Sequence, residues 1–295
     1  MTATLSQDLQ NTHLNNHTDD QQDHDQSLDQ PNMTIDPTRA KNLSTALSSI
    51  LTRISSAKAL SSPSPRLVAV SKLKPATDIL ALHSPPHSHL HFGENYYQEL
   101  LTKSRLLPPE IRWHFIGALQ TNKCRPLAEE VVGLWCVESV DTRKKAEGLE
   151  KGREKLLERL KGEGKEEVGK LRVFVQVNTS GESEKSGVEP DSKELVDLCR
   201  FIRESCSHLK LQGLMTIGAI ARSQGVKEGI ENADFIKLRE VRDTLATELE
   251  IEKEELELSM GMSEDFESAI RCGSNEVRVG STIFGERPPK KEALI

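Results

Sequence analysis

Short apolar runs alternate along the chain with longer segments in which apolar residues recur at helical spacing. Runs of four to eight apolar and β-branched residues, bounded by turn residues, predict buried strands. Eight such runs follow one another: Leu67–Ser71, His89–Glu94, Arg112–Gly117, Leu134–Val140, Arg172–Asn178, Leu211–Gly218, Leu256–Met262 and Glu276–Ser281. Helical periodicity lies between them, for example over Lys193–Ser205 and Ala233–Leu249. This alternation predicts an α/β fold with a parallel sheet, and eight repeats favour a single closed (β/α)8 TIM barrel.

An open, doubly wound sheet is the alternative reading of the same alternation. When such a sheet binds a dinucleotide, a G-x-G-x-x-G turn follows its first strand, and no such turn follows Leu67–Ser71. Residues 37–295 also match the length of about 250 residues that is typical of a barrel. The sequence therefore favours the closed barrel.

Residues 1–36 differ in composition from the rest of the chain. They contain seven aspartates, many Gln and Asn, and no Lys or Arg. Such a segment has too little apolar surface to offset the entropy cost of ordering it, so we predict a disordered tail over 1–36. Asp36 and Pro37 then predict the start of a helix that runs through Ile54, with Asp36 as its N-cap.

The segment Arg143–Lys170 departs from the alternation of apolar strands and amphipathic helices because it is dense in Lys and Glu. Charged residues three or four positions apart are typical of a solvated helix. We expect a charged surface insertion at about 143–170, formed by an extended outer helix and a loop between Gly162 and Gly169.

Charge and cysteine usage narrow the classes of function. The net charge of −7 argues against a broad nucleic-acid-binding surface. The five cysteines are scattered and form no C-x-x-C pair, which is typical of reduced thiols, and we predict no metal site. No apolar run approaches the roughly 18 residues of a membrane span, and the acidic tail is the opposite of an arginine-rich mitochondrial targeting segment. A cytoplasmic location is expected, with mitochondrial association left open.

Lys72 is the first candidate for chemistry. It follows the apolar run Leu67–Val70 and Ser71, so it lies at the carboxyl end of the first predicted strand, where α/β barrels place their functional residues. Partial desolvation there lowers the pKa of an ammonium group and yields an amine that can form a Schiff base with an aldehyde. A solvated lysine at a strand end is the plainer alternative for this segment alone.

The loops after the last two strands predict an anion site. Ser263 follows the seventh strand, and Gly280 and Ser281 end the eighth, each just before a predicted helix (Glu264–Ala269 and from Ile283). Hydroxyl groups and free backbone N–H groups then converge where barrels commonly bind phosphate. Two ordinary serine N-caps are the alternative. Asn95 follows the second strand, and its side-chain amide offers hydrogen-bond donors and acceptors at the same end of the barrel.

An amine nucleophile beside a phosphate site fits a phosphorylated aldehyde. Pyridoxal 5′-phosphate (PLP) is one such ligand, held covalently by the lysine and electrostatically by the loops. A Schiff-base aldolase would use the same pair of groups on a sugar phosphate, so the residues alone leave both open.

The chain resembles the pyridoxal phosphate homeostasis protein family in seven segments. They occur in order between about residues 40 and 287 and include the strand ends described above: Val68–Pro75, Phe92–Tyr96, Trp113–Lys123, Ser183–Gly187, Gly213–Ile217, Leu258–Ser263 and Val277–Gly285. The resemblance implies a single barrel like the N-terminal domain of alanine racemase, with PLP as cofactor. It also implies that Lys72 forms the Schiff base, with Lys74, two residues on, as its rival.

The resemblance assigns the remaining cofactor contacts. Ser263, Gly280 and Ser281 would bind the phosphate, although Thr282 leaves open which of two neighbouring hydroxyls reaches it. Arg278 would lie against the pyridine nitrogen, with a structural salt bridge as the alternative. Asn95 would contact the ring or its substituents, or else fix its own loop by a hydrogen bond. Met260 and Met262 are expected to pack under or beside the ring.

The resemblance favours a carrier over an enzyme, with no catalytic residue assigned. Racemases take a second base, a tyrosine, from another domain, and we expect none here because the chain ends at Ile295. His114 is the nearest substitute, but a histidine within a strand is usually structural. We therefore expect a protein of intracellular PLP homeostasis that buffers, stores or delivers PLP, with PLP-accepting apoenzymes as its partners and a monomeric state. A PLP-dependent enzyme with weak, racemase-like activity on amino acids is the alternative.

Overall fold

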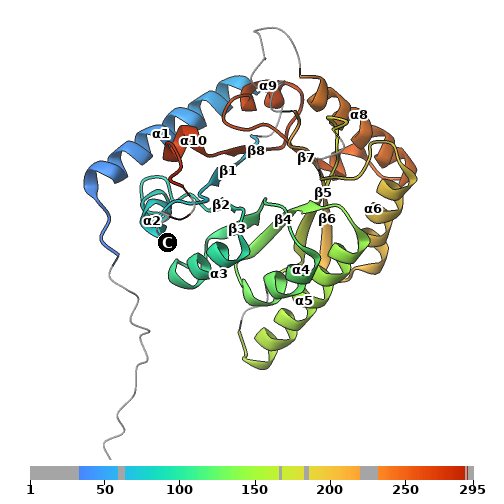
Figure 1. Cartoon of the computed structure of the whole chain (residues 1–295), viewed down its shortest axis with the longest axis horizontal. Helices are drawn as coiled ribbons and strands as arrows, with labels where there is room; N and C mark the ends of the chain where they lie inside the picture. Colours follow the sequence, from blue (N-terminus) through green and yellow to red (C-terminus); the bar gives the residue numbers. More distant parts are fainter. Residues whose placement is uncertain are drawn as a thin grey trace, which may run out of the picture. The chain divides into compact units, whose positions relative to one another are not determined.

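The strands of the chain form one closed parallel sheet. The computed structural model describes residues 33–58, 64–165, 168–182, 186–219, 232–289 and 291. Within them eight strands pair in chain order, and the last also pairs with the first, so the sheet closes into a barrel (Figure 1). The strands are β1 (Arg66–Val70), β2 (His91–Glu94), β3 (Arg112–Phe115), β4 (Leu134–Val140), β5 (Leu171–Gln176), β6 (Leu209–Met215), β7 (Glu257–Ser259) and β8 (Glu276–Val279). The predicted fold class is confirmed.

Helices surround the barrel on its outside, as Figure 1 shows. In the described residues they are α1 (Pro37–Ala57), α2 (Ala76–His83), α3 (Tyr97–Leu106), α4 (Thr121–Glu130), α5 (Arg143–Gly162), α6 (Lys193–Ser205), α8 (Ala233–Glu248), the 3-10 turn η1 (Lys253–Glu255), α9 (Phe266–Arg271) and α10 (Ser281–Phe284). Their apolar faces pack on the outward side chains of the strands in one large core. None of these helices is both long and apolar enough to cross a membrane.

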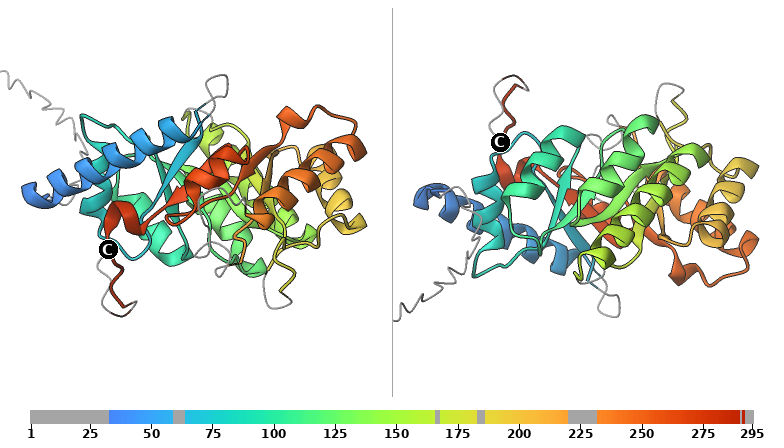
Figure 2. Two further views of the ribbon diagram at one scale, coloured as in Figure 1. Left: turned by 90° about the horizontal axis from the view of Figure 1, so that it is seen from above. Right: turned by 90° about the horizontal axis from the view of Figure 1, so that it is seen from below.

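Helix α1 begins where the sequence predicts. The Asp36 carboxylate accepts a hydrogen bond from the Arg39 N–H, and Pro37 occupies the first helical position. Its buried face consists of residues three or four positions apart: Leu43, Leu47, Ile50 and Ile54. The helix packs against α2, α9 and α10, and Figure 2 shows it along the side of the barrel that carries the C-terminal elements. The predicted tail lies outside the described residues as far as residue 32.

The seventh strand is shorter than predicted. Regular strand geometry covers Glu257–Ser259 rather than Leu256–Met262. Gly261 has a φ of +95°, in the left-handed region that favours glycine, so the chain leaves the strand conformation there. The Asp265 carboxylate then accepts a hydrogen bond from the Met262 N–H at 2.7 Å, and α9 begins only at Phe266. The result is a tight turn directly after β7.

The charged segment 143–170 is mainly helix α5, which connects β4 to β5 and ends at Gly162. One face of α5 is charged, and the other is buried through residues that include Leu149, Leu156 and Leu160. This helix packs closely on α4, where Gly152 allows the backbones to approach: a Cβ there would lie 2.3 Å from the Arg125 carbonyl oxygen. The segment thus supplies a connecting helix of the barrel with an unusually charged outer face.

Replacing Leu156 on the buried face of α5 by alanine should destabilise the fold. The side chain is fully buried, so Leu156→Ala removes apolar contacts and leaves a cavity, which costs about 2–5 kcal/mol. Leu51→Ala on α1 is the matched control, because Leu51 is 40% exposed and should change the free energy of unfolding by less than about 0.5 kcal/mol. Urea denaturation measures both, and equal effects would contradict a packed role for α5.

Candidate functional site

A cavity of about 260 Å³ lies at the carboxyl ends of the strands. All six residues predicted to bind the cofactor line it: Lys72, Asn95, Ser263, Arg278, Gly280 and Ser281. They come from the ends of β1, β2, β7 and β8, which the closed barrel brings to one mouth. The remaining wall is partly apolar and is formed by Val70, Ile116, Met215, Ile217 and Met262, with Glu264 and Arg287.

Lys72 is the amine of this cavity. Its side chain is partly buried, and burial together with the positive charge of Arg287 lowers the pKa of its ammonium group. The charges of Glu94 and Glu99 act in the opposite direction. The net lowering increases the fraction of free amine at neutral pH, which is the form that attacks an aldehyde.

Lys74 does not share this position. It is buried, its Nζ donates a hydrogen bond to the Glu286 carbonyl oxygen, and it is absent from the lining of the cavity. Of the two lysines that the sequence offers, Lys72 is the one that reaches the cavity.

The loops after β7 and β8 meet beside this lysine, because β8 pairs with β1. The Gly280 N–H donates a hydrogen bond to the Ser263 hydroxyl at 3.2 Å, which joins the two loops. Glycine at position 280 leaves room for two neighbours, because a Cβ there would lie 2.8 Å from the Arg287 guanidinium, which would have to move, and 3.2 Å from the Val70 Cβ. Of the two neighbouring hydroxyls, Ser281 lines the cavity and Thr282 does not.

Arg287 is a site residue that sequence reasoning missed. The sequence predicted an anion site from helix starts, but α9 and α10 have only 6 and 4 residues, so few peptide dipoles are aligned there. Arg287 supplies a full positive charge to the same wall. The signal available in the sequence was a positively charged residue, Arg287, soon after Gly280 and Ser281. The apolar residues Ile116, Met215 and Ile217 were also missed, because nothing in their own segments separates them from ordinary core positions.

Of the two methionines expected beside the ring, only Met262 lines the cavity, so Met260 is not placed for that contact and the prediction for Met262 stays a prediction. Met260 is fully buried in the core outside the cavity, and Met262 lines it. The positive φ of Gly261 lies between them, so the chain turns and the two methionines diverge.

Asn95 is positioned by a close approach of two loops. A Cβ at Gly117 would lie 2.2 Å from the Asn95 carbonyl oxygen, so glycine after β3 lets the loop after β2 pack against it. The Asn95 Oδ1 atom is buried and has no hydrogen-bond partner among the described residues. Because a buried polar group without a partner is costly, this amide is available to a ligand.

Arg278 forms the floor of the cavity and is almost fully buried. Its guanidinium donates to the Thr216 carbonyl oxygen at 2.8 Å and to the Ser259 hydroxyl, and lies 3.4 Å from the Glu138 carboxylate. Ser259 in turn donates to Glu138 at 2.7 Å. The structural salt bridge that the sequence left as an alternative is present, and Arg278 also lines the cavity. The ion pair thus fixes the orientation of a cation that faces the cavity.

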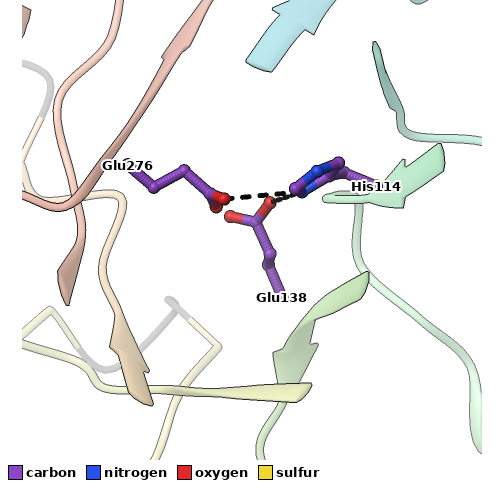
Figure 3. Close-up of side chains that lie close together, drawn as sticks. All are labelled: His114, Glu138 and Glu276. Carbon is purple, nitrogen blue, oxygen red and sulfur yellow. Dashed lines mark hydrogen bonds and ion pairs between the residues drawn. The ribbon is translucent and has the colours of Figure 1, made fainter. Parts of the chain in front are cut away.

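Beneath Arg278, the barrel interior contains His114, Glu138 and Glu276, which Figure 3 shows pointing toward one another. His114 Nδ1 lies 3.0 Å from Glu138 and 3.7 Å from Glu276. Burial lowers the pKa of His114 to about 4, and burial and the charge of Glu138 raise the pKa of Glu276 to about 7. His114 is absent from the lining of the cavity and so is not placed to act as a second base there.

These three groups are close enough to bind a metal ion, but arginines already occupy their carboxylates. Arg66 donates to Glu276 at 2.8 Å, and Arg278 lies against Glu138. A divalent cation would have to displace these guanidinium groups from a buried site. The cluster is a hydrogen-bonded support for Arg278.

Comparison with known proteins places this geometry in a family. The family described as "Alanine racemase, N-terminal domain" matches residues 46–288. The pyridoxal phosphate homeostasis protein of Schizosaccharomyces pombe is 44% identical over 225 residues, which cover 76% of this chain and 85% of that protein. The chain belongs to the pyridoxal phosphate homeostasis protein family.

Two solved structures extend the comparison. PipY of Synechococcus elongatus with PLP bound has 28% sequence identity and a TM-score of 0.58, and the match covers 84% of this chain and all of that one. Alanine racemase of Corynebacterium glutamicum has a TM-score of 0.57 at 14% identity, over 84% of this chain and 61% of the racemase. The racemase match shows the fold alone and confirms the predicted likeness of the barrel. Residues 183–185, part of one motif behind the family prediction, lie outside the described residues.

Replacing Arg287 should shift the reactivity of Lys72 to higher pH. Arg287→Gln removes a positive charge that lowers the pKa of Lys72, so the amine becomes deprotonated only at higher pH. Acylation by acetic anhydride, followed at Lys72 by peptide mass mapping between pH 6 and 11, gives the midpoint. Arg105→Gln, at an exposed arginine paired with Glu130, should leave it unchanged. A midpoint that moves downward or stays in Arg287→Gln would contradict the electrostatic role.

Proposed function

We propose that this chain binds PLP in the cavity at the barrel mouth, as a Schiff base with Lys72, and acts in PLP homeostasis by buffering, storing or delivering the cofactor. The observation that carries the proposal is the convergence of six predicted residues from four strand ends on one cavity. The names of the relatives and the PLP-bound structure of PipY support it.

The groups around the cavity fit the parts of PLP. The partly buried amine of Lys72 suits the aldehyde. The Ser263 and Ser281 hydroxyls, the backbone at Gly280 and the charge of Arg287 suit a phosphate dianion. Arg278 suits the pyridine nitrogen, and Met262 with Ile116 offers apolar surface to the ring.

Covalent attachment needs no group beyond these. The Lys72 Nζ lone pair attacks the aldehyde carbon, a C=N bond replaces the C=O bond, and the oxygen leaves as water. Arg278 can only donate hydrogen bonds, so a pyridine nitrogen facing it must accept and stays unprotonated. When bound, PLP supplies an electrophilic carbon and an electron sink, and the sink is weaker when the ring nitrogen is unprotonated.

The surroundings of Lys72 favour a carrier over a catalyst. Among the described residues that line the cavity, the titratable side chains besides Lys72 are Glu264, Arg278 and Arg287, and no tyrosine or histidine is among them. Tyr97 points elsewhere and donates to Glu130 at 2.9 Å. Because Lys72 is only partly buried, an incoming amine or an acceptor enzyme can reach it.

The cellular context belongs to the same proposal. All five cysteines are free and buried, as expected for thiols in a reducing compartment, and we propose a cytoplasmic location. Apoenzymes that accept PLP are the proposed partners, and a monomer is the proposed state.

Lys72→Ala should abolish covalent attachment of PLP, and Lys74→Ala should retain it. Lys72 lines the cavity, whereas Lys74 is held by the Glu286 carbonyl. The measurement is visible absorbance after addition of PLP, followed by borohydride reduction and peptide mass mapping. A pyridoxyl adduct on another lysine, or no adduct in the unmodified protein, would overturn the assignment. Racemisation of amino acids by the unmodified protein above the Lys72→Ala background would favour the enzyme alternative.

Ser281→Ala should weaken PLP binding by about tenfold to a hundredfold, while Thr282→Ala should change the dissociation constant less than about twofold. Loss of one hydrogen bond to a charged group corresponds to about 1.5–3 kcal/mol, and only Ser281 lines the cavity. Fluorescence titration with PLP and with pyridoxal, which lacks the phosphate, measures the difference. If Ser281→Ala weakens pyridoxal equally, the phosphate assignment is wrong.

A further inference from the structure

A fully buried group of charges lies directly behind Lys72. The Lys103 ammonium on α3 is 2.7 Å from Glu94 Oε1 and 2.7 Å from Glu99 Oε1. The Lys103 and Glu94 side chains have no exposed surface, and that of Glu99 is 9% exposed. Charges are rarely buried so completely unless they are paired, and none of these three residues lines the cavity.

This group holds the backbone on both sides of Lys72. Before it, the Ser71 carbonyl oxygen accepts a hydrogen bond from Lys103 Nζ at 3.0 Å, and the Ser71 hydroxyl donates to Glu94 at 2.7 Å. After it, the Leu73 N–H donates to Glu99 Oε1 at 2.6 Å. The two peptide units that flank Lys72 are therefore fixed by one ion cluster.

The conformation of Leu73 explains why such fixing is needed. Its φ of +61° lies in the left-handed region, which residues with a branched apolar side chain seldom adopt. Such a conformation persists only where the surroundings hold it. At this residue the chain turns, so that Lys72 reaches the cavity while Lys74 reaches the Glu286 carbonyl.

We propose that Glu99 and Lys103 are positioning residues for Lys72: their buried ion pair holds Leu73 in its left-handed conformation and so commits Lys72, rather than Lys74, to the cavity. The proposal rests on the proposed function only for its ligand. The position of Lys72, which the proposal explains, does not depend on which ligand binds.

The test measures which lysine reacts. The full chain is incubated with PLP, reduced with borohydride and mapped, and the ratio of adduct on Lys72 to adduct on Lys74 is determined. Glu99→Ala should lower this ratio by at least about tenfold, the lower end of what the loss of one hydrogen bond to a charged group produces. Glu147→Ala is the matched control, because it removes an exposed pair with Arg143 of the same i,i+4 spacing on α5, and it should leave the ratio unchanged.

A second substitution separates positioning from general stabilisation. Asparagine tolerates the left-handed region, so Leu73→Asn in the Glu99→Ala background should restore most of the ratio. A purely structural ion pair would lower the midpoint of thermal unfolding and leave the ratio as in the unmodified protein, which would overturn the proposal. If Glu99→Ala does not fold, Glu99→Asp, which keeps the charge on a shorter side chain, replaces it with the same expected direction.

Failure of the proposed function gives a different result. If the unmodified chain forms no adduct with PLP at all, the ligand is wrong, and acetic anhydride replaces PLP as the probe. The positioning proposal then still predicts that Glu99→Ala lowers the acylation of Lys72 relative to Lys74, whereas loss of the Glu99 charge alone would lower the pKa of Lys72 and raise its acylation. An unchanged or raised ratio would refute the proposal independently of the ligand.

Discussion

The pairing of β1 with β8 is the contact on which the site depends. It aligns Ala69 with Val279, and the residues that follow each strand, Lys72 on one side and Gly280 and Ser281 on the other, consequently meet at one mouth. Without closure, an amine near the start of the fold and hydroxyls near its end would have no common location. The side chain missing at Gly280 completes the junction, since it leaves room for Val70 and for the guanidinium of Arg287.

Buried charge governs the rest of the site. Barrel interiors are usually filled by branched apolar side chains, but this one contains Arg278, Glu138 and Glu276 beneath the cavity. Each of the two interior carboxylates has an arginine partner: Arg66, which also pairs with Glu257, contacts Glu276, and Arg278 contacts Glu138. Breaking such a pair on one side leaves an uncompensated charge, which is strongly destabilising. The arrangement thereby holds Arg278 in one orientation, as a hydrogen-bond donor that faces the cavity.

Much of the fold could be predicted from the sequence because strands and helices alternate with clear periods. β4 and α6 have the predicted bounds, and all six residues predicted to bind the cofactor line one cavity, because each lies at or soon after the carboxyl end of a strand. The errors have local causes. Gly261 shortens β7 and separates Met260 from Met262. The helix α5 was expected, but its many charges hide its buried face in the sequence.

Residues that depend on long-range contacts could not be predicted. Arg287 reaches the cavity from beyond the last helix. Glu99 and Lys103 have the spacing of an ordinary solvated pair, and nothing in α3 indicates that they are buried against the strand end of Lys72. The polar interior was equally hidden, because Glu138 and Glu276 come from different strands.

The most direct measurement is a crystal structure of the protein with PLP. The account predicts continuous density from Lys72 Nζ to the cofactor, the pyridine nitrogen within hydrogen-bond distance of Arg278, and the phosphate against Ser263, Gly280 and Ser281. Cofactor attached to Lys74, bound outside this cavity, or oriented with its phosphate toward Arg278 would contradict it.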